Sequence, residues 1–217
     1  MVAWLGIVPL FEDRADAGRV LGDELRRREL GDDVVVLGLA RGGVQVAAGV
    51  SAALGAPLDV VAVRKVGHPW QPEYAIGAVT PGDGVYLRGR DGLTQAEMER
   101  AVLEAKEKAA VLDRRLRRGR PAVELPGKVA LLVDDGLATG ATMLAAIRWA
   151  RGRRSARVVV AVPVGAAESV EVVGSEADEV VCLYELEEFG AVGLWYREFP
   201  QVSDEEVLAL LRGPALR

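Results

Sequence analysis

The chain has 217 residues, a net charge of −5, and hydrophobic side chains at half of its positions. This length suits one α/β domain with a small appendage, and the acidic balance gives no electrostatic basis for binding nucleic acid. The single cysteine, Cys182, excludes a disulfide within the chain, and no apolar run is long enough to span a membrane. We therefore expect a soluble, cytoplasmic protein without nucleic-acid or membrane partners.

The N-terminal part predicts a helix, a buried strand and a second helix. Apolar residues at helical spacing follow Asp13 and Asp16, either of which could cap the first helix. A continuous apolar run then ends at Arg41, Gly42 and Gly43, and a second helical pattern follows. An arginine beside two glycines at the carboxyl end of a strand is a plausible anion site, although a plain strand-to-helix turn has the same pattern.

Residues 59–66 predict a second buried strand, which would end in Arg64 and Lys65. Lys65 is the only lysine among the first hundred residues, and we expect it at the ligand-binding edge of the sheet. A solvent-exposed charge at a strand end is the alternative interpretation.

A hairpin is expected next, because two short apolar runs surround a turn at residues 80–84. Glycine and prolines should prevent regular structure over residues 67–73. His68, the only histidine, and Glu73 lie in this stretch, and the sequence leaves their roles open. A metal site would require more nitrogen ligands than one histidine supplies.

A long helix should begin at a capping box formed by Thr94 and Glu97. Its apolar positions recur at spacings of three and four, and it should end in the arginine-rich stretch 114–120. Cations suit a helix C-terminus, so we expect these arginines to be solvated.

The most informative stretch covers residues 129–143. Five apolar residues predict a buried strand, Asp134 and Asp135 follow at its end, and a helical pattern begins near Met143. The intervening residues are small, and the unpaired amides of a helix N-terminus attract phosphate. The two carboxylates could accept hydrogen bonds from vicinal hydroxyls or hold hydrated Mg²⁺. The strand, the two acids, the loop and the helix N-terminus together form a cradle for a sugar phosphate. The alternative interpretation is a solvated strand end followed by an ordinary helix cap.

The remaining strands are expected at residues 157–163 and 179–183, with a short helix at 168–174 between them. Repeated strand–helix units with continuously apolar strands predict a doubly wound parallel sheet. Because ligands bind at the carboxyl ends of such strands, Arg41, Lys65 and the acidic residues should gather at one edge.

Residues 131–142 resemble the ribose-phosphate signature of the type I phosphoribosyltransferases: a hydrophobic strand, two adjacent acids, and a loop ending in Thr139, Gly140 and Thr142. The resemblance extends over most of the chain, and it implies one phosphoribosyltransferase-like domain over residues 1–217. A small hood would come from residues of about 1–31 and 185–217, and a flexible loop or hairpin from about 66–90.

The resemblance also implies a function: Mg²⁺-dependent transfer of ribose 5-phosphate from phosphoribosyl pyrophosphate to a nitrogen acceptor such as a nucleobase. Asp134 and Asp135 would hold the ribose hydroxyls, with Mg²⁺ bound through substrate and water rather than directly by the protein. Lys65 would act in catalysis by neutralising pyrophosphate. Pyrophosphate would also be held by Arg41, Gly42 and Gly43. The 5′-phosphate would be held by Gly136, Leu137, Ala138, Thr139, Gly140, Ala141 and Thr142.

The aromatic residues near the C-terminus are relevant to the identity of the acceptor. Residues 189–202 loosely resemble the tail of the hypoxanthine phosphoribosyltransferases, so Trp195 or Tyr196 could stack on a base, whereas core packing is the alternative role of such a cluster. Members of the family are often dimers, which makes a homodimer a further expectation. A regulatory protein that binds a phosphoribosyl ligand without catalysis is the second functional hypothesis, because one fold hosts many functions.

Overall fold

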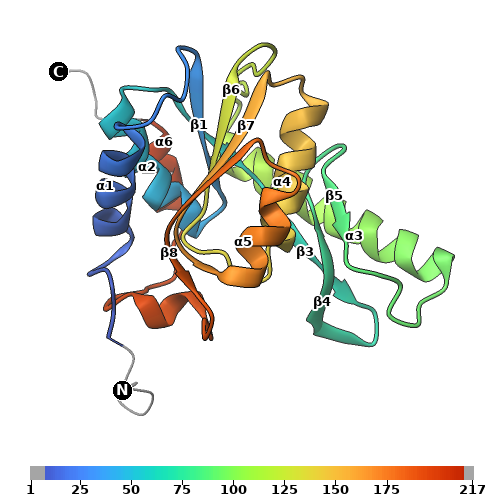
Figure 1. The fold of residues 1–217 in the computed structure, drawn as a ribbon. Coiled ribbons are helices and arrows are strands. Elements are labelled where there is room, and N and C mark those ends of the chain that lie inside the picture. The colour runs from blue at the N-terminus through green and yellow to red at the C-terminus, as the bar shows by residue number, and fades with distance from the viewer. Residues whose placement is uncertain (1–7, 213–217) are drawn as a thin grey trace.

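A computed structural model describes residues 8–212 and is built on a five-stranded parallel sheet (Figure 1). The strand order is β2-β1-β6-β7-β8, and every neighbouring pair is parallel. The strands are β1 (Val34–Leu39), β2 (Leu58–Val61), β6 (Val129–Val133), β7 (Arg157–Ala166) and β8 (Glu179–Leu186). The doubly wound parallel sheet predicted from the sequence is confirmed.

Helices cover both faces of this sheet. On one face lie α1 (Arg14–Leu25) and α2 (Gly42–Leu54), and on the other α4 (Ala141–Gly152) and α5 (Ala167–Gly174) (Figure 1). Each face has its own apolar core: one contains residues of α1, α2 and the sheet, and the other contains most of α4. The Asp13 side chain caps α1 by accepting from the amide of Asp16, as the sequence allowed.

A second, three-stranded antiparallel sheet forms a separate lobe. It consists of β3 (Arg64–His68), β4 (Gln71–Val79) and β5 (Val85–Leu87). The expectation of one strand over residues 59–66 is therefore wrong, because β2 pairs with β1 whereas β3 pairs with β4. The break falls at Ala62 and Val63, which are buried and apolar, so no turn residue marks it.

Regular structure also extends through the stretch where the sequence predicted none. Strand β3 continues to His68, and β4 begins at Gln71. The β3–β4 ladder is irregular beside Gly67, so Pro72 lies where pairing is interrupted and a missing amide hydrogen costs little.

One long helix, α3 (Gln95–Arg117), joins the two lobes. It starts at the predicted capping box, where Thr94 and Glu97 satisfy each other's backbone amides. Its first half packs Ala105 on the antiparallel sheet, and its last turns pack Leu112 and Leu116 against the parallel sheet and the C-terminal helix α6 (Asp204–Leu211).

The C-terminal segment returns to the carboxyl edge of the parallel sheet. It contains the short helix η1 (Val192–Trp195) and an aromatic cluster in which Phe11, Phe189, Trp195 and Tyr196 are buried. The expected hood at residues of about 1–31 and 185–217 overlaps this region, although residues 1–7 and 213–217 lie outside the described part of the chain. Among the described residues, no helix combines the length and hydropathy needed to cross a membrane.

The arginine-rich end of α3 is not simply solvated, contrary to expectation. Arg117 and Arg120 both donate to the carboxylate of Asp59 in β2, at 3.0 and 2.7 Å. Asp59 is 1% exposed, and it also accepts from the amide of Val123. Burial of this carboxylate is tolerated because two cations and an amide surround it.

Asp59→Asn should lower the free energy of unfolding by about 3–5 kcal/mol, because it leaves the largely buried Arg117 without its main anionic partner. Asp113→Asn is the matched control: Asp113 also pairs with Arg117, but its side chain is 28% exposed, so we expect a loss of only about 0–1 kcal/mol. Urea unfolding of both variants measures the difference, and equal losses would contradict the network described here.

Candidate active site

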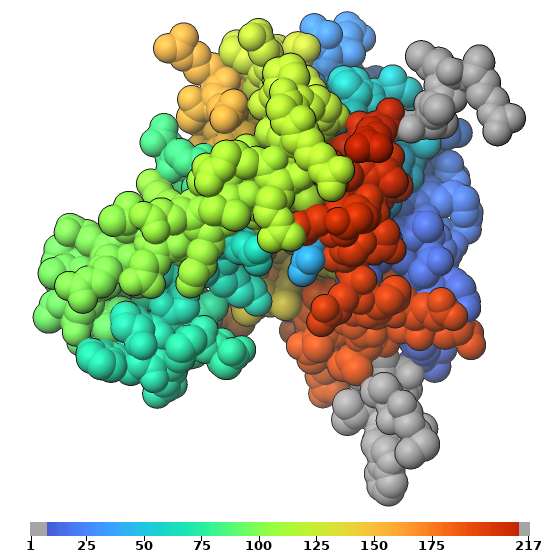
Figure 2. Space-filling view, turned by 180° about the vertical axis from the view of Figure 1, so that it is seen from behind, coloured from blue at the N-terminus to red at the C-terminus, as the bar shows by residue number. Residues whose placement is uncertain are grey.

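The two adjacent carboxylates lie at the carboxyl end of β6, a central strand of the parallel sheet. Asp134 and Asp135 follow directly after Val133, and the amide of Asp135 donates to Oδ1 of Asp134 at 2.9 Å. Both residues are half-buried. The space-filling view shows a hollow between the antiparallel lobe and the C-terminal segment, with the chain that follows β6 at its floor (Figure 2). Asp134 and Asp135, referred to below as the acid pair, thus lie at the edge of the parallel sheet where ligands of such folds bind.

The loop after the acid pair is fixed by its backbone. Leu137 is 2% exposed; its amide donates to the carbonyl of Val164, and its carbonyl accepts from the amide of Ala166, both at 2.9 Å. Gly140 has a φ of 72°, a left-handed conformation that favours glycine. It precedes α4, whose first amides donate to no capping side chain. These amides and the partial positive charge of the helix can therefore serve an anion.

The connection between β1 and α2 lies directly against the acid pair. A Cβ atom on Gly43 would come within 2.8 Å of Oδ1 of Asp134, and one on Gly42 would collide with the carboxylate of Asp135. Only glycine therefore fits at either position without movement. The peptide bond between Ala40 and Arg41 is cis. Gly42 and Gly43 lie beside the acid pair, directly after Arg41 in the chain, and both glycines belong to the first turn of α2.

A buried arginine that the sequence did not single out neutralises Asp135. Nε of Arg14, in the first turn of α1, donates to Oδ2 of Asp135 at 2.7 Å. Its Nη1 donates to the carbonyl of Pro200 at 2.8 Å, and its guanidinium lies 3.6 Å from the ring centre of Phe199. The partner is 121 positions away along the chain, so no local pattern marks Arg14 as different from the other arginines of its helix.

The two aromatic residues proposed for base stacking are packed into the protein. Tyr196 is 3% exposed, and its hydroxyl donates to the carbonyl of Asp135 at 2.6 Å. Trp195 is 9% exposed, and its indole nitrogen donates to the carbonyl of Phe189 at 3.0 Å. Neither ring is open to a stacked base in this structure, whereas Phe199 is 37% exposed beside them.

The surroundings of Asp134 disfavour its charged form. The pKa of Asp134 is raised well above its ordinary value, first because burial disfavours the charged carboxylate and second because Asp135 is a neighbouring anion. Burial likewise raises the pKa of the Tyr196 hydroxyl, which favours its role as a hydrogen-bond donor to the backbone. This shift of the Asp134 pKa arises from the tertiary surroundings, so the pattern of residues alone does not predict it.

Comparison with known proteins identifies this arrangement. A family model described as a phosphoribosyl transferase domain matches residues 16–193 of the chain. The chain belongs to the phosphoribosyl transferase domain family. The match includes the acid pair, the loop before α4 and the connection between β1 and α2, so the family resemblance found in the sequence is confirmed.

Individual relatives agree with this assignment. The Mycobacterium tuberculosis protein named "Putative phosphoribosyl transferase Rv0571c" is 47% identical over 207 residues, which are 93% of this chain and 46% of that protein. The chain therefore spans about half the length of the curated relatives it matches. The crystal structure of TT1426 from Thermus thermophilus is 44% identical, has a TM-score of 0.79, and is matched over 93% of this chain and 97% of that one.

A more distant structure shares the fold alone. AQ2163 from Aquifex aeolicus is 14% identical, with a TM-score of 0.52 and 85% of each chain covered. The overall fold is thus similar at low sequence identity.

Lys65 of this phosphoribosyl transferase domain lies on the antiparallel sheet and not beside the acid pair. It is exposed on β3 and lines a cavity of about 520 Å³ between the β3–β4 hairpin and α3. Arg100 and Lys108 of α3 line the same cavity, whereas neither residue of the acid pair does. His68 also lines it, and its Nδ1 accepts from the amide of Trp70 at 3.2 Å. Glu73 is exposed on β4.

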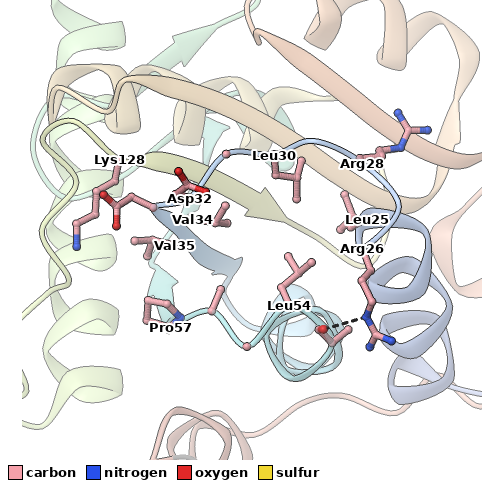
Figure 3. Close-up of a pocket in the computed structure, with 15 residues that line it drawn as sticks. Leu25, Arg26, Arg28, Leu30, Asp32, Val34, Val35, Leu54, Pro57 and Lys128 are labelled. Atoms are coloured by element: carbon pink, nitrogen blue, oxygen red, sulfur yellow. Dashed lines mark hydrogen bonds between the residues drawn. The ribbon is translucent and has the colours of Figure 1, made fainter.

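A further cavity lies at the opposite edge of the parallel sheet, beside the start of β1 (Figure 3). Its volume is about 320 Å³, and its lining combines apolar residues with side chains of both charges, including Arg26, Asp32 and Lys128. Nε of Arg26 donates to the carbonyl of Ala53 at 3.1 Å, so this arginine is already engaged. The mixed lining is not selective for one charge of ligand.

Asp134→Asn should stabilise the folded protein at neutral pH. Between the ordinary pKa of 3.8 and the raised pKa in the folded state, the folded protein binds more protons, so the free energy of unfolding falls as pH rises through this window. Asparagine removes the buried charge while its carbonyl oxygen can still accept from the Asp135 amide. We expect a melting temperature about 2–4 °C above that of the original chain at pH 7, which corresponds to about 1 kcal/mol.

Melting curves between pH 4 and pH 8 test this expectation, and the difference should shrink as the pH falls. The exposed Asp33→Asn is the control for the loss of one negative charge, and it should leave the melting temperature nearly unchanged. A difference in melting temperature that does not change with pH would show that the charge of Asp134 does not cause it.

Proposed function

We propose that this chain catalyses the Mg²⁺-dependent transfer of ribose 5-phosphate from phosphoribosyl pyrophosphate to a nitrogen acceptor, with release of pyrophosphate. The observation that carries the proposal is the meeting of three parts in one place: the acid pair, the N-terminus of α4 and residues 40–43. Each part suits a different portion of a pyrophosphorylated sugar phosphate. A nucleobase is the acceptor class we propose first.

The 5′-phosphate would bind at residues 136–142. The amides at the start of α4 lack a capping side chain, and Ala138 and Thr139 of the preceding loop are exposed. Because Leu137 pairs with β7 through its backbone, the loop is already ordered before a ligand arrives. Pre-ordered amide donors lose little conformational entropy on binding, which favours tight capture of a phosphate.

The ribose hydroxyls would be held by the acid pair. As the C1–oxygen bond to pyrophosphate breaks, positive charge develops on the ribose ring, and a nearby carboxylate stabilises it. Arg14 orients Asp135 through its Oδ2 atom and leaves the second oxygen of that carboxylate outside the ion pair. The acceptor nitrogen then forms a bond to C1 and loses a proton, while pyrophosphate leaves with the electrons of the broken bond.

Departing pyrophosphate would be held by Arg41, by the amides of Gly42 and Gly43, and by Lys65 if the antiparallel lobe approaches the acid pair. Closure of that lobe would also exclude water, which otherwise competes with the acceptor. Within residues 8–212, no group of three or more histidine, cysteine or acidic side chains is placed to hold a metal. The acid pair fits Mg²⁺ that takes most of its ligands from substrate and water, and such an ion would neutralise charge on the leaving group.

Asp135→Asn should reduce turnover by about 100-fold or more, since it removes charge stabilisation from the transition state. The measurement is pyrophosphate release from phosphoribosyl pyrophosphate and Mg²⁺, against a panel of purines, pyrimidines and small amines. Asp33→Asn, an exposed acid before β1, is the matched control and should retain full turnover. Melting curves of both variants check folding, because Asp135 is also the partner of Arg14.

The outcomes separate the two functional hypotheses. Pyrophosphate release that depends on one acceptor would establish the enzyme and identify its substrate. Mg²⁺-dependent binding of phosphoribosyl pyrophosphate without release for any acceptor would favour the regulatory hypothesis. Near-normal turnover of a folded Asp135→Asn variant would refute the role given to the acid pair.

A further inference from the structure

Asp204, the first residue of α6, contacts one residue that the proposed function uses, Arg41, and one residue of α3, Arg115. Its carboxylate is 8% exposed and lies between two arginines. Oδ1 is 3.5 Å from Nη1 of Arg41, and Oδ2 is in ion-pair contact with Arg115 of α3, without a well-aligned hydrogen bond. A carboxylate thus reaches from the C-terminal helix to the arginine beside the acid pair.

The charge of Asp204 is compensated from several sides. The residue lies in the first turn of α6, where the partial positive charge of the helix favours an anion. Ser203 and Glu206 form the capping box of this helix, so Asp204 is not needed as the cap. Its burial is therefore not explained by helix capping, and the two arginines are its remaining partners among the described residues.

Arg41 remains able to bind a ligand while it contacts Asp204. Its side chain is 41% exposed, and the contact engages one of its terminal nitrogens at a long distance. A guanidinium has five N–H donors in a rigid fork, and an unrestrained arginine loses rotamer entropy when it is fixed. A partner that holds one side of the fork leaves the other donors available and lowers this entropic cost.

We propose that Asp204 is a positioning residue that holds the guanidinium of Arg41 ready for the pyrophosphate group of the donor substrate. The inference rests on the proposed function, since it assigns a residue to that same site. Arg115 offsets the negative charge of Asp204, so the carboxylate orients Arg41 without repelling an incoming anion. This role is the same whichever acceptor the enzyme uses, because it concerns only the pyrophosphate group.

Asp204→Asn should weaken the binding of Mg²⁺-pyrophosphate by about 3- to 10-fold and leave the binding of ribose 5-phosphate unchanged. Isothermal titration with these two ligands measures both affinities. Glu205→Gln, the adjacent and exposed acid of the same helix turn, is the matched control for the loss of one negative charge, and it should change neither affinity. Asp204→Ser is a second uncharged variant, with a side chain that suits a helix start, and should behave as Asp204→Asn does.

A double-mutant cycle with Arg41→Gln separates positioning from a general structural effect. In the Arg41→Gln background, Asp204→Asn should weaken pyrophosphate binding no further, because the residue acts only through Arg41. Full additivity, or unchanged or tighter pyrophosphate binding by both Asp204 variants, would overturn the inference.

The same titrations distinguish this inference from the proposed function. If the original chain binds ribose 5-phosphate but not Mg²⁺-pyrophosphate, the role of Asp204 is overturned while the phosphate loop stands. If it binds neither ligand, the proposed function fails together with the inference.

Discussion

Parallel pairing between β1 and β6 is the constraint on which the site depends. Gly38 of β1 is in register with Val133 of β6, so the segments that follow the two strands leave the sheet at the same level. Close packing keeps them together: a Cβ atom on Gly43 would come within 2.7 Å of the Val133 carbonyl oxygen. The first turn of α2 therefore rests on the end of β6, and residues separated by about ninety positions share one small volume.

This proximity creates an electrostatic problem, and the structure solves it with a residue from another element. Two adjacent carboxylates at a half-buried strand end repel each other, and burial together with this repulsion raises the pKa of Asp134. Arg14 supplies the compensating charge from α1, and the C-terminal segment holds that arginine through Pro200 and Phe199. Charge balance at the centre of the site therefore depends on α1 and on the C-terminal segment around residues 199–200.

Local patterns predicted the parts of the fold that local forces determine. The capping box at Thr94, the apolar run before Asp134 and the glycines after β1 each have a direct physical cause, and each was predicted correctly as an element or a boundary. The division of residues 59–66 between two sheets could not be predicted, because Ala62 and Val63 are as apolar as the strand before them. Pairing partners far along the chain, rather than local propensity, decide where that strand ends.

Long-range charge pairs were beyond prediction for the same reason. The sequence placed the acid pair and residues 41–43 at one edge of the sheet, and the structure brings them into contact. It gave no signal for Arg14, Asp59 or Asp204, since a charged residue in a helix or strand pattern is normally solvated, and only the tertiary fold supplies a buried partner. The arginine-rich stretch 114–120 shows the consequence: its composition suggested a solvated helix end, whereas Arg117 of α3 and Arg120 after it enclose a buried carboxylate.

The positions of these unpredicted pairs follow a pattern of their own. Arg14 with Asp135 links α1 to the end of β6, Asp59 with Arg117 links β2 to α3, and Asp204 with Arg41 links α6 to α2. Apolar contacts are not directional, whereas a charge pair restricts the side chains that form it, and the pairs made by Arg14 and Arg117 are also hydrogen-bonded. Since two of the three pairs end on residues of the candidate site, apolar packing builds the sheet and its helices, and buried charge fixes how the site's side chains are oriented within them.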